Sequence, residues 1–563
     1  MLSYIILEMP LDLSRISCHD RPKTLTLLMM AVCRAAVSRT RASPKTAVAC
    51  RRRYCGMLID TLFFAGTLPM SNASDRTSAR PPLTEIVTWN ATTLSQRIHD
   101  RSVSCREVMS AYLDHIDAVN PVVNAMVSRR ERPPLLDEAD GADRELAAGQ
   151  SRGWMHGFPQ AIKDLSDVRG LPTVQGSPLL VGQIASQDSL MVERMRAAGA
   201  IIIGKTNTPE FGLGSQSYNP VFGATRNPFD LSRTAGGSSG GAAAALAMRM
   251  LPVADGSDMM GSLRNPAAFN HVIGFRPSFG RVPDLAADPF GQQLATNGPM
   301  GRTVEDVARL LDTQSGFDSR VPLSLGEPLF PEGSDIAGAL ERDVRGVKIG
   351  WLGAWQGHLS MESGVLALCE AALAHFGRLG CDVEEVDLPF APETLWESWT
   401  KLRHWAVAGN LGAHYANPDS RARLKPEARW EVERGLRLSA QDIHAANVQR
   451  GEAYRAWSAL FERFDYLAMP SAQVFPFDVE THWPRDIAGH PMDSYHRWME
   501  VVVPASMLGA PTISLPAGRN DAGLPMGFQL IGRPRNDWGV LQLARAFEQA
   551  SGDLAILPPT LGM

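Results

Sequence analysis

Two short glycine- and serine-rich loops contain the residues of this chain that could perform nucleophilic chemistry. They are residues 236–241 (GGSSGG) and residues 256–262 (GSDMMGS). A serine hydroxyl attacks a carbonyl carbon once a base removes its proton, and backbone N–H groups in a tight turn can stabilise the resulting oxyanion. The two loops therefore predict a centre for acyl transfer.

A lysine in a separate segment could supply the base. Lys163 ends the short apolar run 158–162 (FPQAI), which suits a lysine presented from the end of a strand into a core. A lone lysine at such a place is usually a surface residue. Only its combination with the two loops gives Lys163 a chemical role.

Two other loop types share parts of this pattern and are disfavoured. Residues 236–240 fit G-x-S-x-G, the nucleophile elbow of α/β-hydrolases, but an elbow follows an apolar strand directly, and residues 230–235 (DLSRTA) precede it here. An elbow would also leave the second loop and Lys163 without a role. Phosphate-cradling loops need G-x-x-x-x-G-K-[ST] or G-x-G-x-x-G between a strand and a helix, and neither occurs in that context.

The elements around the loops predict a layered α/β fold. An Ala-rich helix over 242–250 and a short strand over 251–254 separate the two loops. Residues 347–352, 362–379 and 381–386 alternate as strand, helix and strand, which is typical of a parallel βαβ unit. Further expected elements are helices over 188–198, 303–312 and 538–550, a helix that starts at the capping box 104–107 and stops at Pro121, and strands over 200–203, 512–515 and 528–531.

Together these segments resemble the amidase signature family. The match covers the segments 157–164, 236–241, 256–269 and 274–282, with weaker similarity over roughly residues 83–555. The resemblance implies a mixed central β-sheet flanked by helices, in one amidase signature domain over 83–560. It also implies a hydrolase acting on linear amide C–N bonds, which releases a carboxylate and ammonia or an amine.

The resemblance further implies a role for each site residue. Ser262 matches the nucleophile, Ser238 matches a proton-relaying serine on a cis peptide bond, and Lys163 matches the buried base. Burial near glycines and hydroxyls, without a partner carboxylate, is the physical route by which Lys163 would stay neutral. The backbone N–H groups of Met259, Met260, Gly261 and Ser262 match the oxyanion hole. Gly236, Gly237, Ser239, Asp258 and Arg264 are expected to support the loops.

The implied mechanism needs no metal and no organic cofactor. Lys163 takes a proton from Ser238, Ser238 takes one from Ser262, and Ser262 attacks the carbonyl carbon of the substrate. The relay then returns a proton to the leaving amine, and water hydrolyses the acyl-enzyme.

The chain departs from the family at the nucleophile loop, where Met260 takes the place of a usual glycine. A backbone N–H donor survives a change of side chain, provided that the position does not need a positive φ. The flexible, apolar side chains of Met259 and Met260 could reshape the pocket. We expect activity to be retained with an altered range of substrates.

Composition narrows the choice of partners. A net charge of −5 gives no reason to expect nucleic acid or an anionic membrane, and no apolar run reaches the roughly 18 residues of a spanning helix. We expect a soluble, cytoplasmic enzyme whose substrate is a small-molecule amide. The sequence does not decide whether the enzyme forms a homodimer. Two alternatives also stay open: a glutamine-amidase subunit of a transamidosome-type complex, and an inactive binding protein on the same fold.

Residues 1–82 differ from the rest of the chain. They are rich in arginine, show no clear amphipathic period and contain Cys18, Cys33, Cys50 and Cys55. We expect a disordered or spurious extension, with the functional chain starting near Met70; an export signal after the arginines 51–53 is the alternative. The three later cysteines are expected to be buried apolar residues, and the tryptophans of 392–498 to pack in the core or line a ligand pocket.

Overall fold

The computed structural model describes residues 83–291, 293–552 and 556–562. The described residues belong to one compact unit, 80–563. The expectations for 1–82, including the four early cysteines, lie outside the described residues.

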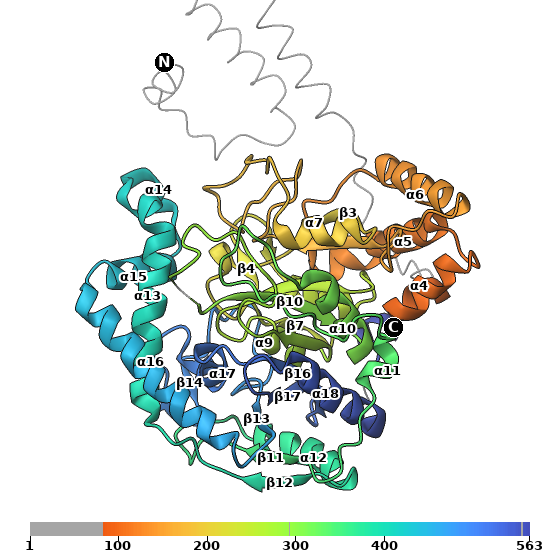
Figure 1. The fold of residues 1–563 in the computed structure, drawn as a ribbon. Coiled ribbons are helices and arrows are strands. Elements are labelled where there is room, and N and C mark those ends of the chain that lie inside the picture. The colour runs from red at the N-terminus through yellow and green to blue at the C-terminus, as the bar shows by residue number, and fades with distance from the viewer. Residues whose placement is uncertain (1–82, 292, 553–555, 563) are drawn as a thin grey trace, which may run out of the picture. The chain divides into compact units, whose positions relative to one another are not determined.

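An eight-stranded mixed sheet forms the centre of this unit (Figure 1). Its strand order is β12-β11-β13-β17-β16-β9-β10-β8, with β11 parallel to β12 and β13 and all other neighbours antiparallel. The strands are β8 (Ala254–Asp258), β9 (Ile273–Arg276), β10 (Thr296–Gly301), β11 (Lys348–Trp351), β12 (Asp382–Glu385), β13 (Tyr466–Pro470), β16 (Thr512–Arg519) and β17 (Pro525–Ile531). The predicted mixed sheet is confirmed, and so is the predicted parallel unit of β11, α12 (Val365–Arg378) and β12.

A three-stranded sheet brings Lys163 to the edge of this centre. Its order is β1 (Met126–Val127), β3 (Ile201–Thr206), β2 (Pro159–Lys163), and β2 runs parallel to β3. All five residues of β2 are buried, and β2 packs beside β8. Lys163 is the last residue of β2, so the strand directs this lysine into the core, as the apolar run before it predicts.

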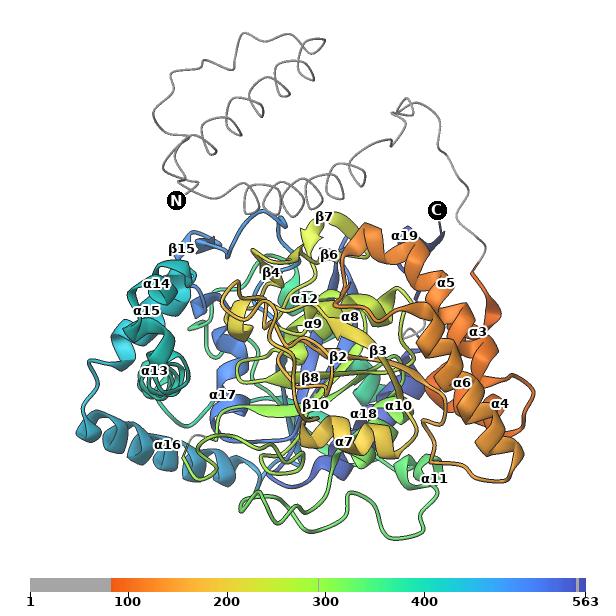
Figure 2. The ribbon, with the colours of Figure 1, turned by 90° about the horizontal axis from the view of Figure 1, so that it is seen from above.

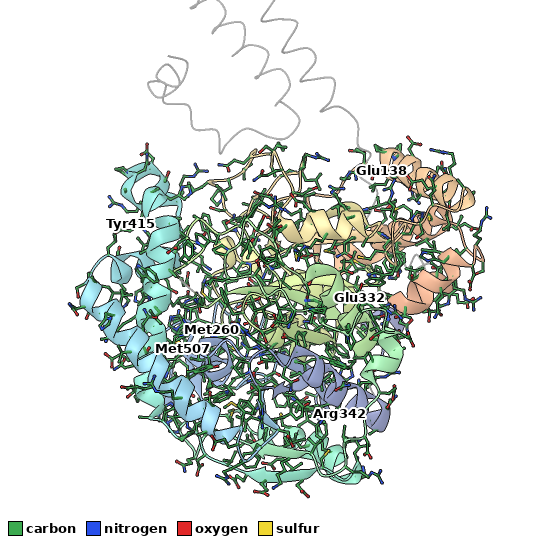
Figure 3. All side chains as sticks on the ribbon, viewed as in Figure 1. Glu138, Met260, Glu332, Arg342, Tyr415 and Met507 are labelled. Carbon is green, nitrogen blue, oxygen red and sulfur yellow. The ribbon has the colours of Figure 1, made fainter. Side chains whose placement is uncertain are left out.

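Helices cover the sheets on both sides, and Figures 1 and 2 place α13–α16 on the side opposite to α3–α6. Figure 3 shows Glu138 of α6 and Tyr415 of α13 at the outer surface. No helix among the described residues is both long and apolar enough to cross a membrane. The helices are α3 (Glu85–Thr88), α4 (Ala91–His99), α5 (Cys105–Val123), α6 (Arg132–Ala147), α7 (Leu190–Ala197), α8 (Gly240–Ala247), α9 (Arg264–Phe269), α10 (Val304–Gln314), α11 (Ile336–Leu340), α12 (Val365–Arg378), α13 (Pro392–Ala416), α14 (Pro418–Arg423), α15 (Pro426–Gly435), α16 (Ala440–Leu460), α17 (Val503–Met507), α18 (Asp537–Ser551) and α19 (Pro559–Gly562).

The predicted bounds of one strand and one helix are wrong. The strand expected over 251–254 lies three residues later, as β8 (Ala254–Asp258), because Gly256 and its neighbours pair with β10. Three of the seven residues of the second glycine-rich segment, 256–258, are therefore strand rather than loop. The helix α5 continues past Pro121 and ends at Asn124, whose left-handed φ of 52° closes it.

The tryptophan-rich segment belongs mainly to the core. Trp399, Trp457 and Trp498 are almost fully buried. Cys105, Cys369 and Cys381 are buried free thiols, as predicted.

Candidate active site

The amine of Lys163 lies among three serine hydroxyls. Its Nζ atom is 2.8 Å from Oγ of Ser238, 2.8 Å from Oγ of Ser239 and 3.0 Å from Oγ of Ser257. The side chain is 1% exposed. Strand β2 and both serine loops therefore meet at one buried nitrogen. Ser239, expected as a support of the loop, approaches this nitrogen as closely as Ser238 does.

Burial favours the neutral form of this amine. It lowers the pKa of Lys163 to about 7, although the charges of Asp255 and Asp258 act in the opposite direction. No carboxylate of a described residue forms an ion pair with Nζ of Lys163. The carboxylate of Asp255 accepts the backbone N–H of Lys163 at 3.1 Å rather than pairing with Nζ, because β8 places it beside the end of β2.

The first serine loop is held by close backbone packing. The peptide bond between Gly237 and Ser238 is cis. The N–H of Gly237 donates to Oδ1 of Asn265 at 3.2 Å, and a Cβ atom on Gly237 would lie 2.8 Å from the backbone nitrogen of Gln216. A larger residue at Gly237 would therefore clash with backbone. At the adjacent expected support, Gly236, the N–H donates to Oγ1 of Thr234 at 3.0 Å.

Buried ion pairs hold the second loop. Oδ2 of Asp258 accepts the Nε–H of Arg264 at 3.0 Å, and Oδ1 lies 3.2 Å from Nη1 of Arg276. Burial alone would raise the pKa of Asp258, but the two guanidinium groups hold it below its ordinary value. Arg264 also donates to Oε1 of Gln529 at 2.7 Å and so ties the loop to β17. These contacts agree with the supporting role expected for Asp258 and Arg264.

Three of the four expected oxyanion donors remain available. The N–H of Gly261 donates to Oδ1 of Asp258 at 2.9 Å, so in this conformation it cannot also bind an oxyanion. By contrast, the N–H groups of Met259, Met260 and Ser262 donate to no acceptor within the described residues. The expectation for Gly261 is therefore corrected, because Asp258 at the end of β8 reaches back to it.

The substitution at Met260 is compatible with the loop backbone. Met260 does not have a positive φ, whereas Gly261 has a φ of 78°. A Cβ atom on Gly261 would lie 2.8 Å from the side chain of Val502. The loop therefore needs glycine at 261 and tolerates another residue at 260.

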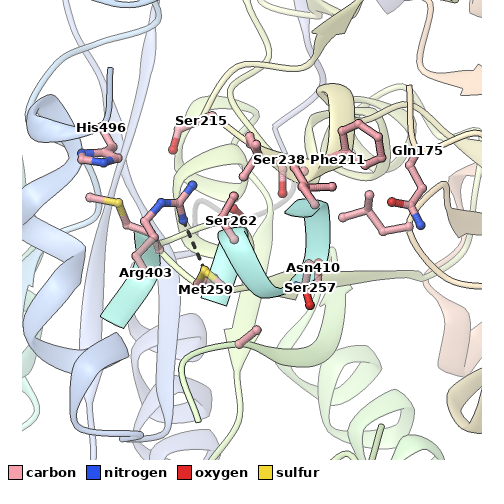
Figure 4. Close-up of a pocket in the computed structure, with 18 of the residues that line it drawn as sticks. Gln175, Phe211, Ser215, Ser238, Ser257, Met259, Ser262, Arg403, Asn410 and His496 are labelled. Atoms are coloured by element: carbon pink, nitrogen blue, oxygen red, sulfur yellow. Dashed lines mark hydrogen bonds between the residues drawn. The ribbon is translucent and has the colours of Figure 1, made fainter. Parts of the chain in front are cut away.

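A cavity of about 190 Å³ opens over the serine loops. Ser238, Ser257 and Ser262 line it together with Met259 and Met260, and Figure 4 shows Ser238 and Ser262 in the same pocket. Ser262 is 8% exposed, and its hydroxyl accepts no hydrogen bond from a described residue. Apolar side chains form much of the remaining wall: Leu165, Phe211, Leu213, Val407 and Leu411. None of the described lining residues is a tryptophan.

The polar wall of this cavity comes from helices distant in sequence. Arg403 of α13 donates through Nε to Glu431 of α15 at 2.6 Å and through Nη2 to the hydroxyl of Tyr495 at 2.8 Å. Its Nη1 meets only the weak acceptor Sδ of Met259, at 3.3 Å (Figure 4). Glu431 is fully buried and also accepts a hydrogen bond from His404. One N–H edge of Arg403 thus faces the cavity beside the second serine loop.

Comparison with known proteins agrees with this geometry. The Amidase family pattern matches residues 107–541. The chain belongs to the amidase signature family. It is 33% identical over 481 residues to an acylamidase of Rhodococcus erythropolis, covering 82% of this chain and 94% of that protein. It is also 32% identical to one subunit of the glutamyl-tRNA(Gln) amidotransferase of Moorella thermoacetica, covering 83% of this chain and 97% of that relative.

Solved structures of amidase signature enzymes share the fold. A bacterial aryl acylamidase of this family superposes with a TM-score of 0.78 at 30% identity, covering 84% of this chain and 99% of that chain. As an amidase signature enzyme, the protein is a hydrolase of amide C–N bonds.

Sequence reasoning found the residues with local motifs and missed those without. Lys163, Ser238 and Ser262 all reach one site, at the positions where the glycine-rich segments predict them. Ser257 and Asp255 were missed, although both lie in or next to the second motif. Arg403 and Glu431 were also missed, because no local sequence pattern predicts a contact between two separate helices.

Proposed function

We propose that Ser262 attacks the carbonyl carbon of a carboxamide, with Ser238 and Lys163 relaying the proton. The observation that supports this most directly is the 2.8 Å distance between Nζ of Lys163 and Oγ of Ser238, in a cavity that Ser262 also lines. A neutral amine accepts the proton of Ser238, and Ser238 accepts that of Ser262. The N–H groups of Met259, Met260 and Ser262 stabilise the oxyanion.

The relay then runs in reverse. Ser238 delivers a proton to the leaving nitrogen, the C–N bond breaks, and the acyl group stays on Ser262. Water attacks this ester with the same relay as base and releases the carboxylate.

The substrate is an aryl or alkyl amide with a polar group beside the reacting carbonyl. The apolar wall suits the aryl or alkyl part, and the acylamidase and aryl acylamidase relatives favour the same class. The Nη1 edge of Arg403 offers a donor for a carbonyl or carboxylate oxygen of the substrate. Esters of the same acids are expected to be cleaved as well, because their leaving groups depart more easily.

Hydrolysis of a panel of aliphatic, aryl and peptide amides tests this proposal. Replacing Ser262 with Ala is expected to lower kcat by about 10⁴-fold or more, and Lys163→Ala by about 10²- to 10⁴-fold. A fluorophosphonate probe should label the wild-type protein and not the Ser262→Ala variant. Equal labelling of both proteins would contradict the role of Ser262.

The second candidate function is that of a glutamine-amidase subunit. The 32% identity to a subunit of a glutamyl-tRNA(Gln) amidotransferase favours it. We prefer the free-standing enzyme because Met260 changes the nucleophile loop and because Val407 and Leu411 of α13 contribute to an apolar pocket wall. Preferential hydrolysis of glutamine, together with co-purification of a tRNA-handling partner, would favour the second candidate instead.

A further inference from the structure

A second cavity, of about 350 Å³, lies apart from the active site. Residues that line it include Thr88, Asn90, Arg249, Arg302, Thr303 and Glu548. None of these residues lines the active-site cavity. The cavity reaches solvent beside Thr88, which is exposed.

Arg249 is buried in this cavity without a partner. It is 8% exposed, and no described residue accepts a hydrogen bond from its guanidinium or forms an ion pair with it. Its backbone has a φ of 58°, a left-handed conformation that favours glycine. The left-handed conformation closes the C-terminus of α8, where the N–H of Met250 donates to the carbonyl oxygen of Ala245 at 2.8 Å. A buried cation without a partner among the described residues is unfavourable and points to a group that is bound when the protein is in solution.

A second guanidinium lines the same cavity. Arg302 is 6% exposed and donates to the carbonyl oxygens of Leu251, at 2.7 Å, and of Trp89. Carbonyl groups do not neutralise its charge. Burial, followed by the charge of Arg302, lowers the pKa of Arg249 to about 9. Two positive charges therefore meet at this cavity, and the nearby charge of Asp306 acts in the opposite direction on the pKa of Arg249.

Two carboxylates lie near the guanidinium groups. The charge of Asp306 acts on both Arg249 and Arg302, and Oδ2 of Asp306 accepts no hydrogen bond from a described residue. Glu548 accepts the N–H of Val304 at 2.8 Å and pairs with Arg545 at 2.7 Å. Asp306 accepts the N–H of Thr92 at 3.0 Å. Neither carboxylate forms an ion pair with Arg249.

Neutral polar groups complete the cavity. Oδ1 of Asn90 accepts the N–H of Thr93 at 2.7 Å, which leaves its amide N–H groups as donors. Oγ1 of Thr303 accepts the N–H of Asp306 at 3.1 Å, and its hydroxyl interacts with the carboxylate of the same residue. Two guanidinium groups and an amide match the acceptor oxygens of a small oxyanion.

We propose that this cavity binds a small oxyanion, a phosphate or a carboxylate, between Arg249 and Arg302. The site is separate from the amide-cleaving site, so its occupancy can be tested whether or not the proposed catalytic relay holds. Bound anion pairs the charge of Arg249 and stabilises the segment between α8 and β8, where this residue lies.

Thermal unfolding of the full chain tests the site. The protein is heated in sodium chloride, sodium phosphate and sodium acetate at equal pH and ionic strength, and isothermal titration with phosphate or acetate measures affinity. We expect phosphate or acetate to raise the Tm of the wild-type protein above its value in chloride, and the arm with the larger rise identifies the anion class. No rise in either arm would overturn the proposal.

Variants at Arg249 connect the effect to the cavity. Arg249→Gly is expected to abolish the anion-dependent rise and to unfold at a higher temperature than wild type in chloride, because it removes the buried charge and suits the left-handed backbone. Arg249→Lys should weaken binding at least tenfold. The control is Arg101→Gly, since Arg101 is also left-handed, with a φ of 59°, but is exposed. An unchanged anion effect in Arg249→Gly would overturn the proposal.

One further variant distinguishes an external anion from the chain's own carboxylate. Asp553, outside the described residues, follows Gly552 in the sequence. If only the Asp553→Asn variant responds to phosphate or acetate, an internal carboxylate fills the cavity and the proposal fails. A response in both wild type and Asp553→Asn supports it.

Discussion

The burial of Lys163 determines the protonation state of its amine. Its amine is the proposed proton acceptor, and burial lowers its pKa to about 7. Below this pH the amine is protonated and cannot accept the proton of Ser238. We therefore predict that kcat/KM rises with pH between about 6 and 8, with an apparent pKa near 7. A pH–rate profile on a substrate that does not titrate in this range is the measurement, and activity that falls across the range would contradict the role of Lys163.

Asp255 should influence the pH at which kcat/KM rises, that is, the acidic limb of the pH–rate profile. Burial raises the pKa of Asp255 to about 6, so its carboxylate is charged where Lys163 titrates and favours the protonated amine. Asp255→Asn removes this charge, and we predict that the acidic limb of kcat/KM moves to lower pH. Ser257→Ala serves as a control that removes a neutral contact of the same amine. A limb that stays in place in Asp255→Asn would show that this carboxylate does not tune the base.

Two adjacent residues of the second serine loop, Met260 and Gly261, differ in backbone conformation. Met260→Gly is expected to keep kcat within a few-fold of wild type and to admit bulkier acyl groups, because only a side chain is lost from the cavity wall. Gly261→Ala is expected to lower activity strongly, because its φ is 78° and the added Cβ meets Val502. Steady-state kinetics of both variants on acyl amides of increasing size is the measurement. Similar losses in the two variants would contradict this distinction.

Helices α13 and α15 depend on a buried ion pair at the cavity wall. Removing the charge of Glu431 leaves the guanidinium of Arg403 buried without its carboxylate. We predict that Glu431→Gln lowers the free energy of unfolding by about 3 kcal/mol. Denaturant unfolding measures this loss, with Glu433→Gln as the control, because Glu433 lies exposed on the same helix. A loss no larger than that of the control would mean that water or another group compensates Arg403.

At the level of the whole chain, the proposed site lies within residues 163–496, inside the segment 107–541 that matches the family. We predict that a variant beginning at Met70 keeps the kcat and Tm of the full chain. Activity and thermal unfolding of the two purified proteins are the measurements. A large loss in the shorter protein would assign residues 1–69 a part in folding or catalysis.

Local sequence predicts the α/β fold, and together with the resemblance to the amidase signature family it predicts the three residues of the proposed relay. Lys163 ends an apolar strand, and Ser238 and Ser262 lie in glycine-rich segments whose tight backbone allows few other residues. Alternating strands and helices likewise predict the parallel β11–α12–β12 unit, because their periodicity is a property of neighbouring residues.

Contacts between distant segments could not be predicted in this way. The pairing of β8 with β10 turns part of a glycine-rich loop into strand, and the capture of the Gly261 N–H by Asp258 removes one expected donor. The cavity wall at Arg403 depends on packing between α13 and α15, and the pair Arg249 and Arg302 depends on where β10 ends beside α8. Such contacts depend on the packing of the whole core, which brings together charged residues that are tens of residues apart in the sequence. A short sequence pattern contains no information about such a contact.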